Sequence, residues 1–166
     1  MNVEQLIKNG LKKGSDAVDY SPAFTAYAKT IANTLSNSLD VKTYHSDDMN
    51  YSHAQIIFLF LDLKFNLISF ETDAQYQVKI WVSSIENLYI ITFFEKLQSQ
   101  PITWKRVLFP QNIILDNLIN RIDEVMLTFS LSKFPSEKEN LSAEGYYTEL
   151  DNLPATLFQF FFSELE

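Results

Sequence analysis

Residues 75–82, with the sequence QYQVKIWV, decide the fold class. Every second residue of this stretch is apolar: Tyr76, Val78, Ile80 and Val82. Gln77 and Lys79 stand between them, and this period of two residues is typical of a β-strand. Such a strand usually packs one face on a core and turns the other toward water. We therefore expect one buried face and one solvent-exposed face here.

The chain on both sides of this strand is also rich in β-branched and aromatic residues. Breaks near 64–66 and 72–74 divide residues 55–82 into successive antiparallel strands. A short strand is expected at 41–45, before a polar loop at 46–52. Residues 84–97 fit both a helix and a strand, and their β-branched and aromatic content favours the strand. Another strand is expected at 102–109, before Pro110.

Amphipathic segments flank this run of strands. Apolar spacing predicts helices over residues 2–13, 22–39 and 112–131, with Gly14 ending the first and Ser21-Pro22 starting the second. Residues 134–151 are polar and contain Gly145, so we expect a long surface loop with room for one helical turn. Pro154 suits the first turn of a terminal helix. Its apolar residues are spaced to pack against the body: Leu157, Phe158, Phe161, Phe162 and Leu165.

The order helix, helix, strands, helix, helix indicates a single α+β domain over residues 1–166. We expect an antiparallel sheet of about 4–6 strands with two N-terminal helices and two C-terminal helices packed on it. The phenylalanine-rich end, residues 157–162, is expected to be buried. If one of its faces is exposed instead, a homodimer is the expected consequence.

Composition excludes several classes of function. The chain of 166 residues has no cysteine, so it has no disulfide, thiolate zinc site or cysteine nucleophile. A net charge of −8 argues against binding to nucleic acid or to an anionic membrane surface. The apolar runs are too short to cross a bilayer, and the first residues lack the apolar core of a signal peptide. We expect a cytoplasmic protein.

Motifs for catalysis or cofactor binding are missing. The chain has only three glycines, Gly10, Gly14 and Gly145, which are too few for a phosphate-binding loop, and we expect no cofactor. His45, Asp47 and His53 are the candidates for metal ligands, but the interpretation we favour is a solvated loop without metal. Acidic pairs such as Asp47 with Asp48 are expected to lie in exposed turns, and the two arginines in ion pairs. We do not expect an enzyme.

One acidic segment is a candidate binding surface for a partner. Residues 135–166 hold seven carboxylates and one lysine. Carboxylates steer a basic partner and exposed tyrosines anchor an interface, so this segment predicts a protein–protein contact. The alternative is a solvated loop whose tyrosines fold back onto the core. The candidate residues are Glu137, Glu139, Glu144, Tyr146, Tyr147, Glu149 and Asp151.

In size, acidity, abundance of Phe and Tyr, absence of catalytic motifs and the acidic stretch at 137–151, the chain resembles the small acidic immunity proteins of bacteria. These neutralise toxins delivered by neighbouring cells, and many of the toxins are basic and attack nucleic acids. The resemblance implies a non-enzymatic toxin inhibitor whose carboxylates meet the lysines and arginines of a basic, nuclease-type partner. It assigns no individual residue.

Two other functions are compatible with the same sequence. An acidic secretion or assembly chaperone would dimerise and offer apolar grooves to an unfolded client. A small-ligand protein or enzyme would assemble its site from scattered residues such as His45, Asp47, Trp81 and Arg106, in a deep pocket.

Overall fold

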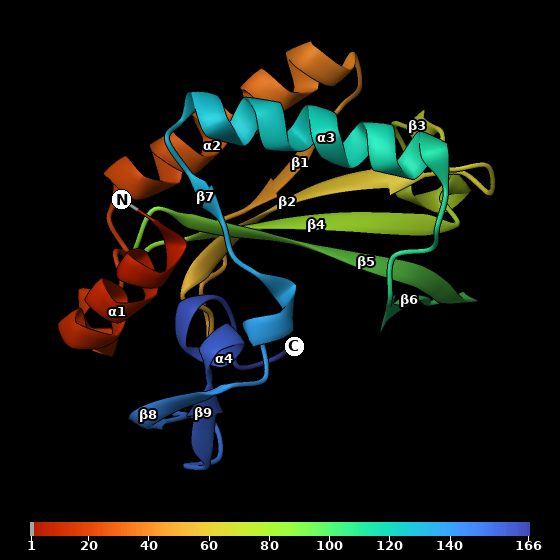
Figure 1. Ribbon diagram of the computed structural model, residues 1–166. Coiled ribbons are helices and arrows are strands. Elements are labelled where there is room, and N and C mark those ends of the chain that lie inside the picture. The colour runs from red at the N-terminus through yellow and green to blue at the C-terminus, as the bar shows by residue number, and fades with distance from the viewer. Residues whose placement is uncertain (1) are drawn as a thin grey trace.

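A computed structural model describes residues 2–166. Seven strands form one sheet in the order β1–β2–β4–β5–β6, with β3 paired to β2 and β7 paired to β5 (Figure 1). Among the strand pairs of the described residues, only β5–β7 is parallel. The strands are β1 (Tyr44–Ser46), β2 (Ala54–Leu61), β3 (Leu67–Ile68), β4 (Tyr76–Ser83), β5 (Leu88–Ser99), β6 (Ile102–Val107) and β7 (Ser132–Lys133).

The α+β class and the antiparallel sheet are therefore confirmed, and the ambiguous stretch at 84–97 contains a strand. The expected number of strands is too low, because β3 and β7 have only two residues each and show no period in the sequence. Among the described residues, no helix has the length and apolar character needed to cross a bilayer.

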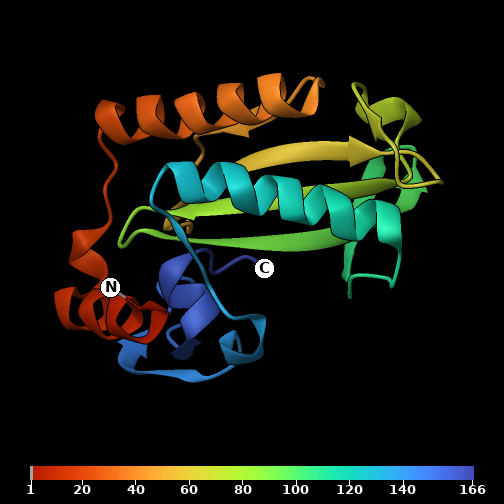
Figure 2. The same cartoon turned by 45° about the horizontal axis from the view of Figure 1, so that its top comes forward.

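Within residues 2–166, four α-helices cover the two faces of the sheet. They are α1 (Val3–Lys13), α2 (Pro22–Leu39), α3 (Ile113–Thr128) and α4 (Leu157–Phe161). Side-chain caps start the long ones: Ser21 Oγ accepts the Phe24 N–H at 3.2 Å, and Asn112 caps α3. Figures 1 and 2 show α2 and α3 side by side on one face, and α1 and α4 on the other. The expected grouping of two N-terminal and two C-terminal helices holds only roughly, since β7 and two later strands, β8 (Ser142–Tyr147) and β9 (Pro154–Thr156), separate α3 from the very short α4.

The face under α2 and α3 holds an aliphatic core. Strands β2, β4 and β5 direct alternate residues into it, and Ile57, Val78 and Ile80 are completely buried there. Burial of each such side chain stabilises the fold by about 1.5–3 kcal/mol.

The opposite face of β4 is not open to water, so the expectation of one wet face is wrong. Trp81 is 1% exposed and Gln77 4% exposed on this face. A second core forms there from α1, α4 and the C-terminal segment, and Phe158 packs edge-on against Trp81 at 5.7 Å between ring centroids. The sequence period does not show this, because the covering residues lie about 80 positions away.

The segment at 134–151 is only partly the loop that its polarity predicts. It includes the expected helical turn, at Ser136–Lys138. Strand β8 (Ser142–Tyr147) follows and pairs with β9 (Pro154–Thr156), with an irregularity at Gly145, whose φ is +84°. The buried residues of these two strands, Ala143 and Ala155, are small, so the sequence shows no clear apolar alternation here.

The terminal helix is also shorter than expected. Pro154 lies in β9, and α4 begins after Thr156, whose Oγ1 accepts the Gln159 N–H at 3.2 Å while Gln159 Oε1 accepts the Thr156 N–H at 3.0 Å. Leu165 lies beyond the helix and is exposed. Burial of the phenylalanines is confirmed, so this segment gives no support for a dimer.

Gly10 should be essential for docking α1 onto α4. A Cβ at this position would lie 2.4 Å from Phe161 Cε1. Although alanine improves helix propensity by about 1 kcal/mol, we expect Gly10→Ala to lower the free energy of unfolding by about 1–3 kcal/mol through overpacking. Urea unfolding measures this, with the exposed Lys12→Ala as control. A Gly10→Ala protein as stable as wild type would contradict the close packing of these helices.

Candidate functional site

A cleft of about 1280 Å3 opens at the outer edge of β5, between β6 and β7. Strand β6 pairs with β5 only from Phe93 onward, and β7 pairs only with Leu88 and Tyr89. In the described part of the chain, no strand pairs with residues 90–92 on this side. We call this opening the edge cleft.

The hydrogen-bond register places a main-chain donor and acceptor in the edge cleft. Lys96 N donates to Gln75 O at 2.9 Å, so the main-chain N–H and C=O groups of the even-numbered residues of β5 point toward β4. Phe134 N donates to Tyr89 O at 2.7 Å on the opposite side of β5, so the main-chain groups of the odd-numbered residues point away from β4. By this alternation the N–H and C=O of Ile91 point into the gap. Within residues 2–166 they have no partner there.

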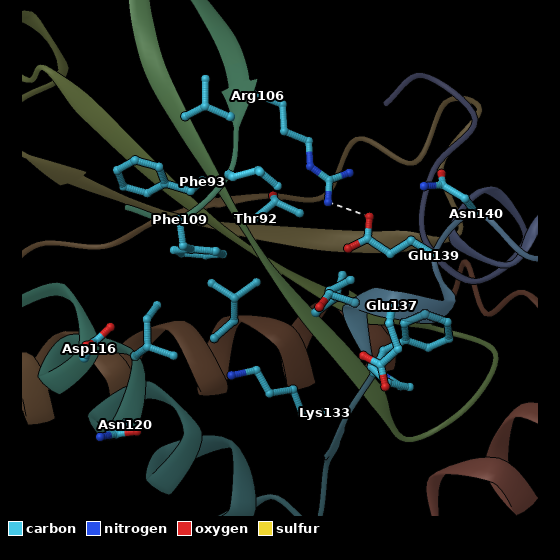
Figure 3. A pocket seen from close by; sticks show the side chains of 18 residues that line it. Thr92, Phe93, Arg106, Phe109, Asp116, Asn120, Lys133, Glu137, Glu139 and Asn140 are labelled. Atoms are coloured by element: carbon cyan, nitrogen blue, oxygen red, sulfur yellow. Dashed lines mark hydrogen bonds and ion pairs between the residues drawn. The ribbon is translucent and has the colours of Figure 1, made fainter. Parts of the chain in front are cut away.

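The walls of the edge cleft combine aromatic rings with charged groups that are already paired (Figure 3). The Phe93 and Phe109 rings lie 5.4 Å apart between centroids. Arg106 reaches from β6 to Glu139, with 2.5 Å between Nη2 and Oε2, and its guanidinium lies 5.1 Å from the centre of the Phe158 ring. The expectation of an ion pair is confirmed for Arg106, whereas Arg121 donates to Ser38 O at 2.9 Å and forms no ion pair within residues 2–166.

A second paired group borders the cleft beside α3. Tyr89 Oη donates to Asp123 Oδ1 at 2.7 Å, and Lys133 Nζ lies 2.9 Å from Asp123 Oδ2. Burial, together with this hydrogen bond and the charge of Asp123, raises the pKa of Tyr89 well above its ordinary value.

Two carboxylates of the edge cleft have no cationic partner within the described residues. Asp116 in the first turn of α3 and Glu137 in the turn after β7 are exposed, and neither forms an ion pair within the described residues. Because Arg106 and Lys133 already have acidic partners, the unbalanced charge of the cleft is negative. The arrangement can accept a cationic group and a main-chain amide.

Comparison of the chain with models of protein families, with curated proteins and with solved structures gives no match. The function must therefore be inferred from the geometry of this molecule.

The structure divides the seven predicted partner-binding residues among three places. Glu139 pairs with Arg106, and the Tyr146 hydroxyl donates to Leu11 O while its ring packs on Phe160. Glu137 lines the edge cleft. The other four, Glu144, Tyr147, Glu149 and Asp151, lie exposed in or after β8.

The turn after β8 is hydrogen-bonded to the C-terminal segment. The N–H groups of Glu149 and Leu150 donate to the Glu164 carboxylate at 2.8 and 3.0 Å, and Glu164 N donates to Tyr51 O at 2.9 Å. Partial burial raises the pKa of Tyr20, and the charges of Glu149 and Glu164 raise it further. The acidic hairpin surface comprises Tyr20, Tyr51, Glu144, Tyr147, Glu149, Leu150, Asp151, Leu153 and Glu164.

Of the three candidate metal ligands, the two histidines make other contacts and Asp47 is exposed. His45 Nε2 lies 2.7 Å from Gln55 Oε1, and His53 Nδ1 lies 2.7 Å from Phe160 O. His53 is buried, so the expectation of a fully solvated loop is wrong at this position. Across residues 2–166, no three potential ligands are grouped to hold a metal. Of the scattered residues considered for a ligand site, only Arg106 lines the edge cleft.

The edge cleft was not predicted from the sequence, although the unequal lengths of two neighbouring strands indicated it. Residues 84–97 and 102–109 were both expected to be strands, and Pro110 limits how far the second can continue. In the structure β5 has 12 residues and β6 has 6. A strand twice as long as its neighbour must leave part of its edge unpaired unless another segment covers it.

The Arg106–Glu139 pair should contribute more than an exposed pair. We expect Arg106→Met to lower the free energy of unfolding by about 1–3 kcal/mol, because Glu139, whose side chain is 11% exposed, loses its partner. In a double-mutant cycle with Glu139→Gln we expect a coupling energy of about 1 kcal/mol or more. The control cycle, Lys138→Met with Glu4→Gln, should give a clearly smaller coupling energy, because the Glu4 side chain is 69% exposed. Equal coupling energies in the two cycles would contradict a stronger contribution from the Arg106–Glu139 pair.

Stability should also depend on Tyr89 at alkaline pH. Its pKa is raised in the folded protein and is about 10 in the unfolded chain. The folded state therefore holds a proton that the unfolded state releases, and this stabilisation is present below about pH 10 and declines above it. We expect the free energy of unfolding of Tyr89→Phe to fall less steeply than that of wild type above about pH 10. The free energies are measured by urea unfolding at each pH. If those of wild type and Tyr89→Phe fell equally steeply above about pH 10, the raised pKa of Tyr89 would be contradicted.

Proposed function

We propose that this chain is a non-enzymatic binding protein that neutralises a basic protein partner. The partner that best fits is a bacterial toxin of the nuclease type, which makes the chain an immunity protein. Such a toxin carries lysines and arginines for its nucleic-acid substrate, and an acidic protein can occupy the same groups.

The acidic hairpin surface is the observation that supports this proposal. Residues 139–166 contain six carboxylates and no lysine or arginine, which is a local charge of −6 out of −8 for the chain. Tyr20 and Tyr147 are 64% and 62% exposed, and Leu150 and Leu153 are also exposed. Large exposed side chains beside carboxylates combine the two parts of a protein interface, apolar anchors and steering charge.

The mechanism that follows is occlusion. The carboxylates attract the partner from a distance and accelerate encounter, while the tyrosines and leucines are removed from water in the complex. The contacts of Glu164 with Tyr51 and with the hairpin hold the surface in place before binding, which reduces the entropy lost on association.

The proposal predicts capture of a basic protein that depends on this surface. Tagged wild-type protein from its native cells is expected to retain a stoichiometric basic partner, and Glu144→Lys with Glu149→Lys is expected to release it. Repulsion of like charges at the interface should weaken binding at least tenfold. The purified pair is then measured by calorimetry at two salt concentrations, and the nuclease activity of the partner is assayed with and without the chain.

The matched control is Asp73→Lys with Glu124→Lys, which changes the net charge equally at exposed positions outside the acidic hairpin surface. This variant should bind like wild type. If both charge-reversed proteins lose the partner equally, only net charge matters and the proposed surface is wrong. If the chain leaves the partner's activity unchanged, the proposal of an immunity protein fails.

A further inference from the structure

We propose that the edge cleft binds an extended, cationic peptide segment, which adds to the sheet as a short strand beside β5. The inference rests on the proposed function, because the segment is assigned to the same basic partner. It adds a second contact that is built differently from the acidic hairpin surface.

The free main-chain groups of Ile91 are the first part of the argument. Ile91 is 5% exposed, yet its N–H and C=O face the cleft without a partner in the described chain. Buried main-chain groups are nearly always hydrogen-bonded. An extended peptide can satisfy both groups of Ile91 at once, which is how exposed sheet edges bind peptides.

The size of the cleft favours a chain segment over a small molecule. Its volume of about 1280 Å3 exceeds the roughly 300–1,000 Å3 of a typical small-ligand pocket. It also reaches both faces of the sheet, from Asp116 and Ile119 on α3 to Phe134 and Glu137 on the segment that leads to the opposite core. A single strand has side chains on both faces and can fill both parts.

The charges specify the side chains of the segment. A residue opposite Ile91 directs its side chain to the α3 face, where Phe93, Phe109 and Asp116 lie. The aliphatic stem of such a side chain can pack on the two rings, and a cationic end can pair with the carboxylate of Asp116. The two neighbouring residues point to the other face and can bring lysines toward Glu137. Arg106 and Lys133 oppose this little, because each already pairs with a carboxylate.

The experiment titrates the full chain with blocked peptides of the sequence Val-Lys-X-Lys-Val, in which X is Leu, Phe or Arg. Binding is followed by amide NMR and by calorimetry. At least one peptide is expected to bind with a dissociation constant of about 1 mM or lower, and to shift the Ile91 amide. Methylation of the N–H of residue X should weaken binding at least tenfold, because that group donates to Ile91 O.

Two protein variants test the charges. Asp116→Asn with Glu137→Gln should weaken binding of the lysine peptides roughly threefold to tenfold at low salt, whereas Asp73→Asn with Glu124→Gln should leave it unchanged. Replacing both peptide lysines by glutamate should abolish binding. Circular dichroism verifies that each variant is folded.

Several outcomes overturn the inference. They are no binding by the whole panel at several millimolar, equal binding of the N-methylated peptide, and binding that leaves Ile91 unperturbed. The result is separable from the proposed function, since Glu144 and Glu149 do not line the cleft. Partner capture without peptide binding rejects only the cleft, and peptide binding without a captured partner rejects only the proposed function.

Discussion

The central ladder of β2, β4 and β5 carries apolar side chains on both faces, and the rest of the chain must cover them. Ile57, Val78 and Ile80 face α2 and α3, whereas Trp81 and Ile90 face the core of α1 and α4. Each large apolar side chain left in water would forfeit about 1.5–3 kcal/mol, which is a large part of the net stability of a domain. The chain therefore has to pass beneath the sheet as well as above it.

This requirement explains where the edge cleft lies. After β6 the chain rises to α3, and after α3 it descends past the end of β5 to reach the second core (Figures 1 and 2). Both crossings use the same edge of the sheet, and neither pairs with residues 90–92. The crossings are tied to the body by Arg106 with Glu139 and by Lys133 with Asp123. The gap between them is thus a consequence of covering both faces of the sheet.

Local sequence patterns were sufficient for part of this fold. The apolar stripe and the Ser21-Pro22 start predict α2 at its observed bounds, and the period of two predicts β4. Features that depend on distant segments could not be obtained in this way. Burial of the second face of β4 requires α4, and pairing of β8 requires β9. Tyr146 and Tyr147 are adjacent and chemically identical, yet only the first reaches Leu11, so the sequence could not separate the internal residue from the exposed one.

The two proposed contacts would affect different steps of binding. The acidic hairpin surface is exposed and strongly charged, so it acts over about a Debye length, roughly 10 Å at 0.1 M salt, and mainly accelerates encounter. The edge cleft acts only at contact, because hydrogen bonds of Ile91 need an extended segment already aligned with β5. Interactions of that kind slow dissociation. A protein that must hold a toxin inactive needs both properties, since fast encounter without slow release leaves the toxin free part of the time.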